Sequence, residues 1–152
     1  MTKGLTLIEI LIVMAVVLIL LTFIIIPFKR MNDTQALSKE TQNIISIINQ
    51  ARSQTLSSKG GVEHGVHFES SQVVLFSGPT YVPSDPNNAL IPLHALVSIS
   101  SINLSGGVTD IVFAKLTGTT AASGTITLSL VASSTQAKII SINSTGIVNG
   151  SP

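Results

Sequence analysis

The chain has 152 residues, a formal net charge of +1 and a hydrophobic content of 45%. It contains no cysteine, which excludes disulfides, thiolate metal sites and thiol nucleophiles. Six basic and three acidic residues give residues 1–60 a charge of +3, whereas two basic and four acidic residues give residues 61–152 a charge of −2. The C-terminal part therefore has no electrostatic signature of nucleic-acid binding.

The first feature along the chain is an apolar run over residues 10–26, in which Thr22 is the only polar residue. A helix over residues 5–26 would be about 33 Å long, enough to cross a hydrocarbon core of about 30 Å. A cleaved secretory signal is a poor match, because such a signal has a shorter apolar region and small residues at its cleavage site. A plain membrane anchor fits better but does not explain Glu9, since burying a charge costs roughly 2.5–3.5 kcal/mol at a bilayer centre and less near its edge.

The opening sequence KGLTLIE, followed by about twenty mostly apolar residues, is similar to the N-terminal signal of type IV prepilins and type II secretion pseudopilins. The resemblance implies that prepilin peptidase cuts after Gly4 and that Leu5, the new first residue, is N-methylated. This position is often Phe in the family, so Leu5 is a departure. Glu9 becomes the fifth residue of the processed chain, where the family has a glutamate that takes part in assembly.

Cleavage would place the α-amino group of Leu5 and the carboxylate of Glu9 at the edge of the same apolar helix. Each charge then needs a partner once it is removed from water. Leu5 and Glu9 are four residues apart, so a pair within one subunit is possible. In the family the glutamate is thought to pair with the N-terminus of a neighbouring subunit, and the sequence does not choose between the two arrangements.

Pro27 closes the apolar run and predicts a kink, because proline removes one helical hydrogen bond. Residues 28–58 are amphipathic at helical spacing, and we expect one long helix over residues 5–57 that stops at Gly60-Gly61. A separate helix capped by Asp33 or Thr34 is the alternative. The apolar stripe expected to face the rest of the protein comprises Leu37, Thr41, Ile44, Ile45, Ile48, Ala51 and Leu56.

Short β-type segments separated by turn residues follow the helix. Alternation is clearest in TITLSL, where Ile126, Leu128 and Leu130 share one face. The expected strands cover residues 62–68, 72–76, 96–104, 110–115, 125–131, 137–143 and 147–148. These segments predict a twisted antiparallel sheet or a small sandwich packed against the helix.

This half of the chain resembles the GspH/FimT-type minor pilins and pseudopilins. The matching segments are NIISIINQARSQTLSSKGGVEHGVHF and GTITLSL, with AKIISINSTGIV at the end. Members of this branch tend to carry Ala-Arg-Ser near the end of the helix, here with Arg52 at its centre, and a Gly-Arg pair near the C-terminus. Ile147 follows Gly146 here, so the second arginine is missing, which places the DNA binding known in some relatives in doubt.

Two histidines, His64 and His67, raise the possibility of a metal site. Residues three apart on a strand point to opposite faces, so we expect no metal site and no cofactor. Arg52 is expected to close the helix C-terminus or to pair with an acidic group. The sequence shows no nucleophile elbow, zinc-protease motif or phosphate-binding loop, so an enzyme is not expected.

Together these observations predict an α+β protein, in which a long N-terminal helix, first transmembrane and then amphipathic, packs on a C-terminal antiparallel β-sheet domain. The expected parts are a leader at 1–4, a transmembrane or filament-core helix at 5–28, its amphipathic continuation at 29–60 and an extracytoplasmic β-domain at 61–152. The expected location is the bacterial inner membrane, with a single span, and then the filament.

The resemblance implies a subunit of a type IV pilus or a type II secretion pseudopilus. Its expected partners are other pilin subunits, prepilin peptidase, the inner-membrane assembly platform and lipid. Two alternatives stay open: a DNA-uptake or adhesion module, which would bind DNA in a salt-dependent way, and an uncleaved membrane-anchored β-domain, which would keep Met1.

Overall fold

The computed structural model describes residue 4 and residues 6–150, and the side chains of residues 23–30 lie outside the description. The chain divides into two compact units, Met1–Thr34 and Gln35–Pro152. A single helix, α1 at Leu7–Leu56, contributes residues to both units. This helix confirms the prediction of one long helix rather than a second one starting near Asp33.

The first unit holds the apolar part of α1. The large apolar side chains from Leu7 to Leu21 are between 44% and 82% exposed, and they occur on every side of the helix. Pro27 lies within the bounds of α1, but its side chain is outside the description, so the predicted kink stays a prediction. Within the described residues, no helix is identified as long and apolar enough to cross a membrane.

The second unit begins with the amphipathic part of α1, which buries one stripe. Leu37, Ile44, Ile48 and Ala51 are buried as predicted, and Ile47, which the predicted stripe omitted, is buried as well. Leu56 does not belong to this stripe, because it lies in the last turn of α1 and is 40% exposed. The prediction for Leu56 was therefore wrong.

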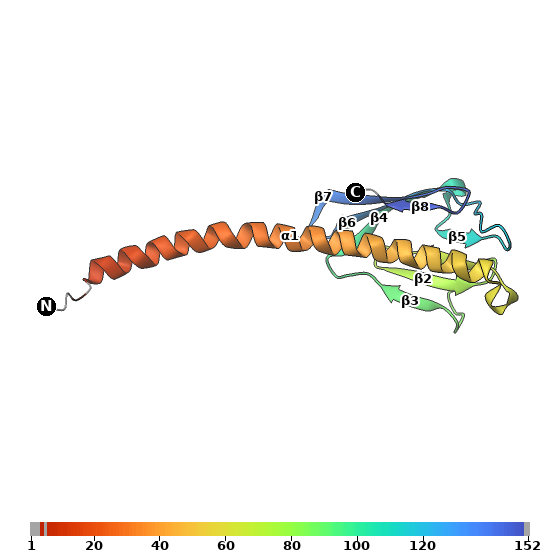
Figure 1. Cartoon of the computed structure of the whole chain (residues 1–152), viewed down its shortest axis with the longest axis horizontal. Helices are drawn as coiled ribbons and strands as arrows, with labels where there is room; N and C mark the ends of the chain where they lie inside the picture. Colours follow the sequence, from red (N-terminus) through yellow and green to blue (C-terminus); the bar gives the residue numbers. More distant parts are fainter. Residues whose placement is uncertain (1–3, 5, 151–152) are drawn as a thin grey trace. The chain divides into compact units, whose positions relative to one another are not determined.

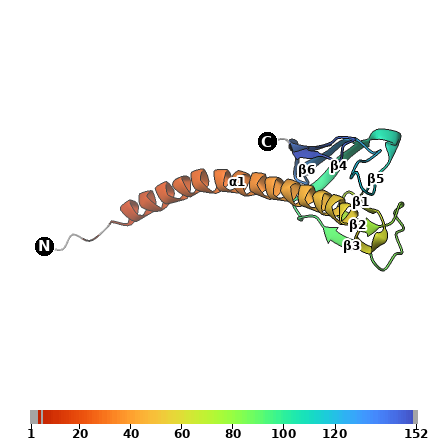
Figure 2. The same cartoon turned by 45° about the vertical axis from the view of Figure 1, so that its right-hand side comes forward.

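In the described part of the chain, eight strands follow α1 and form two antiparallel sheets of four strands each (Figure 1). The first sheet has the order β3-β2-β1-β5, with β1 at His64–Phe68, β2 at Gln72–Ser77, β3 at Ala89–Pro92 and β5 at Asp110–Phe113. The second sheet has the order β4-β6-β7-β8, with β4 at Val97–Leu104, β6 at Gly124–Leu130, β7 at Ser133–Ile142 and β8 at Val148–Gly150. Within the second unit, the two sheets and the helix surround one shared core (Figure 2). This arrangement confirms the predicted α+β class.

The register of the second sheet follows the alternation in TITLSL. Ile126, Leu128 and Leu130 are buried, and Ile126 pairs with Ile140, which is also buried. Of the alternate residues, Thr125 and Thr127 are partly exposed, whereas Ser129 is buried. This prediction from period-two alternation is confirmed.

The strand β3 was not predicted, and β7 starts four residues before its predicted start. The sequence Ala-Leu-Ile-Pro is short and ends in proline, which is tolerated at the edge of a sheet but is a weak strand signal. The first five residues of β7, Ser133 to Ala137, are exposed and show no apolar alternation. The presence of β3 and the early start of β7 both depend on pairing with a neighbouring strand. A local sequence pattern does not reveal this pairing.

Candidate functional site

The structure describes only part of the N-terminal processing and assembly site that the sequence predicts. Gly4 is exposed, whereas Leu5 lies outside the described residues. Thr6 and Glu9 form a reciprocal pair, in which the Thr6 N–H donates to Glu9 Oε2 at 3.4 Å and the Glu9 N–H donates to the Thr6 hydroxyl at 3.3 Å. This is a capping box, which satisfies two backbone N–H groups at the start of a helix.

The capping box gives Glu9 a structural role that the sequence analysis did not consider. The signal for it was present, since Thr-x-x-Glu before an apolar run is the pattern of a capping box. Both members of the pair lie after Gly4, so cleavage at that position would leave them in the chain. A negative charge in the first turn also suits the helix dipole.

The two histidines of β1 lie in different environments, as strand alternation predicts. His64 is only 3% exposed, and its Nδ1 has no hydrogen-bond partner among the described residues. Its backbone N–H donates to the Thr55 hydroxyl at 2.9 Å, which ties β1 to α1. Burial lowers the pKa of His64, and the nearby Lys59 cation lowers this pKa further.

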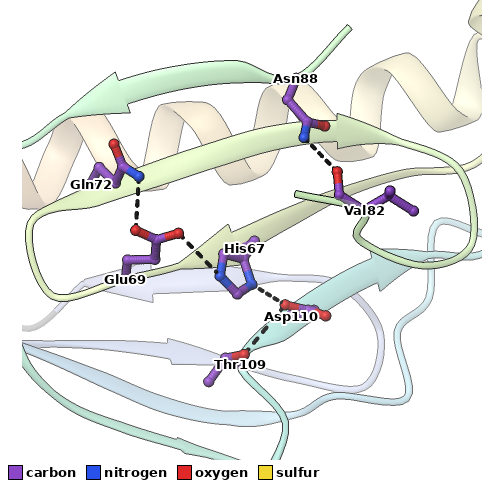
Figure 3. Close-up of polar contacts among 7 residues, drawn as sticks. All are labelled: His67, Glu69, Gln72, Val82, Asn88, Thr109 and Asp110. Atoms are coloured by element: carbon purple, nitrogen blue, oxygen red, sulfur yellow. Dashed lines mark hydrogen bonds and ion pairs between the residues drawn. The ribbon is translucent and has the colours of Figure 1, made fainter. Parts of the chain in front are cut away.

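His67 forms a polar cluster on the other face of β1 (Figure 3). Its Nδ1 contacts the carboxylate of Asp110 on β5, and its Nε2 lies 3.5 Å from Glu69 Oε1. The amide of Gln72 donates to the second oxygen of Glu69 at 2.8 Å. Tyr81 stacks on the His67 ring, with ring centroids 4.0 Å apart.

This cluster holds the connection between β2 and β3 against the first sheet. Tyr81 also contacts Phe76, whose ring lies against Gly65, where a Cβ atom would come within 2.4 Å of the Phe76 ring. Asn88 donates to the Val82 carbonyl at 2.8 Å and closes the same connection (Figure 3). The two carboxylates contact different ring nitrogens of His67, so the cluster does not converge on one cation. Among the described residues, no group of three or more possible ligands for a metal ion is found.

Arg52 on α1 ties two distant turns to the helix. Its Nε donates to the Gly118 carbonyl at 3.0 Å, and its Nη2 donates to the Thr145 carbonyl at 3.4 Å. Gly146 makes this close approach possible, because it has a φ of +76° and a Cβ atom there would come within 2.1 Å of the Gly118 carbonyl oxygen. The sequence predicted that Arg52 would close the helix C-terminus or pair with an acidic group. These two bonds instead go to backbone carbonyls of turns that are distant in the sequence.

The fold and the exposed apolar helix define the class of this protein. The N-terminal helix is long, and its first part is apolar on every side. Its last part packs one stripe against antiparallel sheets. This is the architecture of a pilin-like subunit. Two crystal structures of the type IV minor pilin FimU from Pseudomonas aeruginosa show the same fold. They share 11% and 13% sequence identity with the chain, with TM-scores of 0.56 and 0.59. The matches cover 76% and 83% of this chain and 93% of the FimU chain in each case.

A family model described as "Type II transport protein GspH" matches residues 40–146. The chain therefore belongs to the GspH family, which confirms the resemblance to the GspH/FimT-type branch. No curated protein matches the sequence significantly. The family consists of structural pilin-like proteins that associate with other pilin subunits, and it indicates a membrane-anchored component of a pilus or pseudopilus.

Replacing Arg52 by Ala removes both hydrogen bonds to the turn carbonyls. We expect the free energy of unfolding to fall by about 1.5–3 kcal/mol, because bonds to a charged donor are stronger than neutral ones. Denaturant unfolding measures this loss. The control is Lys59→Ala, an exposed cation three residues after α1, which should change stability by less than about 0.5 kcal/mol. Equal losses for the two variants would contradict the structural role of Arg52.

The buried His64 makes stability depend on pH. At high pH the imidazole is neutral in both states, but below its ordinary pKa of 6.5 the unfolded chain takes up a proton before the folded chain does. The free energy of unfolding therefore falls with falling pH, by at most about 1.4 kcal/mol per pH unit, until the lowered folded-state pKa is passed. His64→Leu should be less sensitive to acid than the wild type in denaturant unfolding.

A His64→Leu profile parallel to that of the wild type would show that His64 is not the source of the acid sensitivity.

Proposed function

We propose that this chain is a minor pilin or pseudopilin subunit that prepilin peptidase cuts between Gly4 and Leu5 and that is methylated on Leu5 before it assembles. The proposal covers type IV pili and type II secretion pseudopili, because the family description refers to type II transport and the similar structures are type IV minor pilins. The proposed role is structural, without catalysis and without a cofactor.

The observation that carries the proposal is the exposed apolar surface of α1 from Leu7 to Leu21. A helix that is apolar on every side needs apolar surroundings, which lipid or other helices supply. We propose that residues 5–28 anchor the subunit in the inner membrane and later form part of the filament core. Transfer from lipid to filament is feasible because neighbouring helices offer apolar contacts equivalent to those of lipid.

The remaining parts of the proposal follow from this placement. Residues 1–4 form the leader, residues 29–60 continue the helix and residues 61–152 form an extracytoplasmic domain. The partners are other pilin subunits, prepilin peptidase and the inner-membrane assembly platform.

Glu9 has two proposed roles that can be separated by experiment. As a member of the capping box it accepts a hydrogen bond from Thr6, which an uncharged glutamine also does. As a charge partner for the α-amino group of Leu5, in the same subunit or the next one, it must be ionised. Only the second role requires the leader to be removed.

Mass spectrometry of the mature protein tests the processing step. We expect a chain that begins at Leu5 and carries one methyl group on its α-amino nitrogen. An intact chain beginning at Met1 would show that the protein is an uncleaved membrane-anchored domain. Cleavage at any position other than Gly4 would contradict the assignment of the leader.

Substitution of Glu9 tests the assembly step. Glu9→Ala and Glu9→Gln should both be cleaved like the wild type, and both should enter filaments poorly, because neither carries the charge that pairs with the new α-amino group. Quantitative immunoblotting of purified filaments measures incorporation. If Glu9→Gln is incorporated normally while Glu9→Ala is not, capping explains the residue and the charge pair does not.

A further inference from the structure

The connection between β5 and β6 presents the most exposed large apolar side chain of the second unit. Leu116 is 86% exposed and has a φ of +68°, a left-handed conformation that leucine rarely adopts. Glycine relieves such a conformation and is used elsewhere in the same turn, at Gly118. The chain thus places a leucine where neither burial nor backbone geometry favours one, and such an outlier justifies a search for a function.

The segment that presents Leu116 is held rigidly. Within residues 114–119, the Ala114 N–H donates to the Thr119 carbonyl and the Gly118 N–H donates to the Ala114 carbonyl, at 2.8 and 2.9 Å. The Lys115 ammonium donates to the Gly61 carbonyl at 2.5 Å, and Arg52 donates to Gly118. These bonds fix the position of Leu116 before any partner binds, which lowers the entropic cost of binding.

Leu116 does not stand alone at this end of the domain. Three further exposed apolar side chains, Leu56, Val62 and Ile147, lie on segments connected to this turn. Leu56 lies on α1 four residues after Arg52, Val62 follows Gly61, and Ile147 lies two residues after Thr145, whose carbonyl also accepts a hydrogen bond from Arg52. We call these four residues the distal apolar patch. A group of exposed apolar side chains on a rigid support is typical of a surface that binds another protein.

The charges of the second unit are unevenly distributed about this patch. Residues 52–63 and 114–119 carry three basic groups and one acidic group, whereas the rest of residues 35–152 carries two basic and four acidic groups. The cations nearest to the patch in sequence are Lys59 and Lys115, both exposed. A partner surface should therefore combine an apolar pocket with flanking carboxylates.

We propose that the distal apolar patch binds a different filament subunit, with Leu116 inserted into an apolar pocket that acidic residues surround. This inference rests on the proposed function, and it adds the contact surface and the chemistry of the partner. A second copy of this chain is a weaker candidate. One cavity of the described residues, of about 220 Å³, has Val108, Asp110 and Val112 in its lining, but the Asp110 carboxylate already contacts His67.

Substitution of Leu116 by Gly separates a binding role from a structural one. Glycine relaxes the left-handed backbone and removes the side chain, so the melting temperature of the isolated full chain should stay equal or rise. Incorporation into filaments should fall about tenfold or more, as for the loss of a binding hot spot. The control Val131→Ala removes another exposed apolar side chain, between β6 and β7, and should leave incorporation unchanged.

Cross-linking identifies the partner surface. The natural chain has no cysteine, so Leu116→Cys labelled with a benzophenone maleimide carries one photoreactive group. In assembled filaments it should cross-link to another subunit at a segment that contains apolar residues and Asp or Glu. The exposed control Ser134→Cys should give no such product. The charge reversal Lys115→Glu should reduce the Leu116→Cys product severalfold.

Several results would overturn the inference. A lower melting temperature for Leu116→Gly would show a role in folding. A cross-link to a second copy of this chain would exclude the proposed partner. The absence of any cross-link in filaments that contain the labelled chain would exclude it as well. If the wild-type chain and the Leu116→Gly variant enter filaments equally well, this inference is refuted and the proposed function stands. If the wild-type chain is itself absent from filaments, the proposed function is refuted as well.

Discussion

The burial of one stripe of α1 against both sheets is the interaction on which the second unit depends. Ile44, Ile48 and Ala51 are completely buried, and they belong to one core with Ile126 of the second sheet and Val66 of the first. Among the described residues each strand pairs only within its own sheet. The shared core therefore joins the sheets to each other and to the helix, together with a hydrogen bond from the Ile99 N–H to the Ser70 carbonyl at 3.0 Å. Apolar burial supplies the stabilisation without directional contacts.

Polar contacts then fix the turns that the core leaves free. Arg52 bonds to the Gly118 and Thr145 carbonyls, so one helical side chain positions two turns that are far apart in the sequence. On the outer face of the first sheet, His67 and Tyr81 do the same for the connection between β2 and β3. A rigid domain of this kind can present a side chain such as Leu116 to a partner at low entropic cost.

The two parts of α1 require different surroundings. In the second unit only one stripe is apolar, because the sheets cover one side and water contacts the other. From Leu7 to Leu21 every side is apolar and exposed, so stability in that region requires surroundings that the chain does not itself provide. Members of the family to which the chain belongs associate with other pilin subunits, which can supply such apolar surroundings.

The sequence by itself determined the helix, the facing of Ile126 and Leu128, and the family, because apolar periodicity and a compact N-terminal motif are local properties. It also contained the Thr6–Glu9 capping pattern. Tertiary structure alone decided β3, the contacts of Arg52 and the exposure of Leu116. These features depend on which distant segments meet, and local periodicity carries no information about a carbonyl 66 residues away. An exposed leucine and a buried one look alike in a sequence until the fold determines which of them has neighbours.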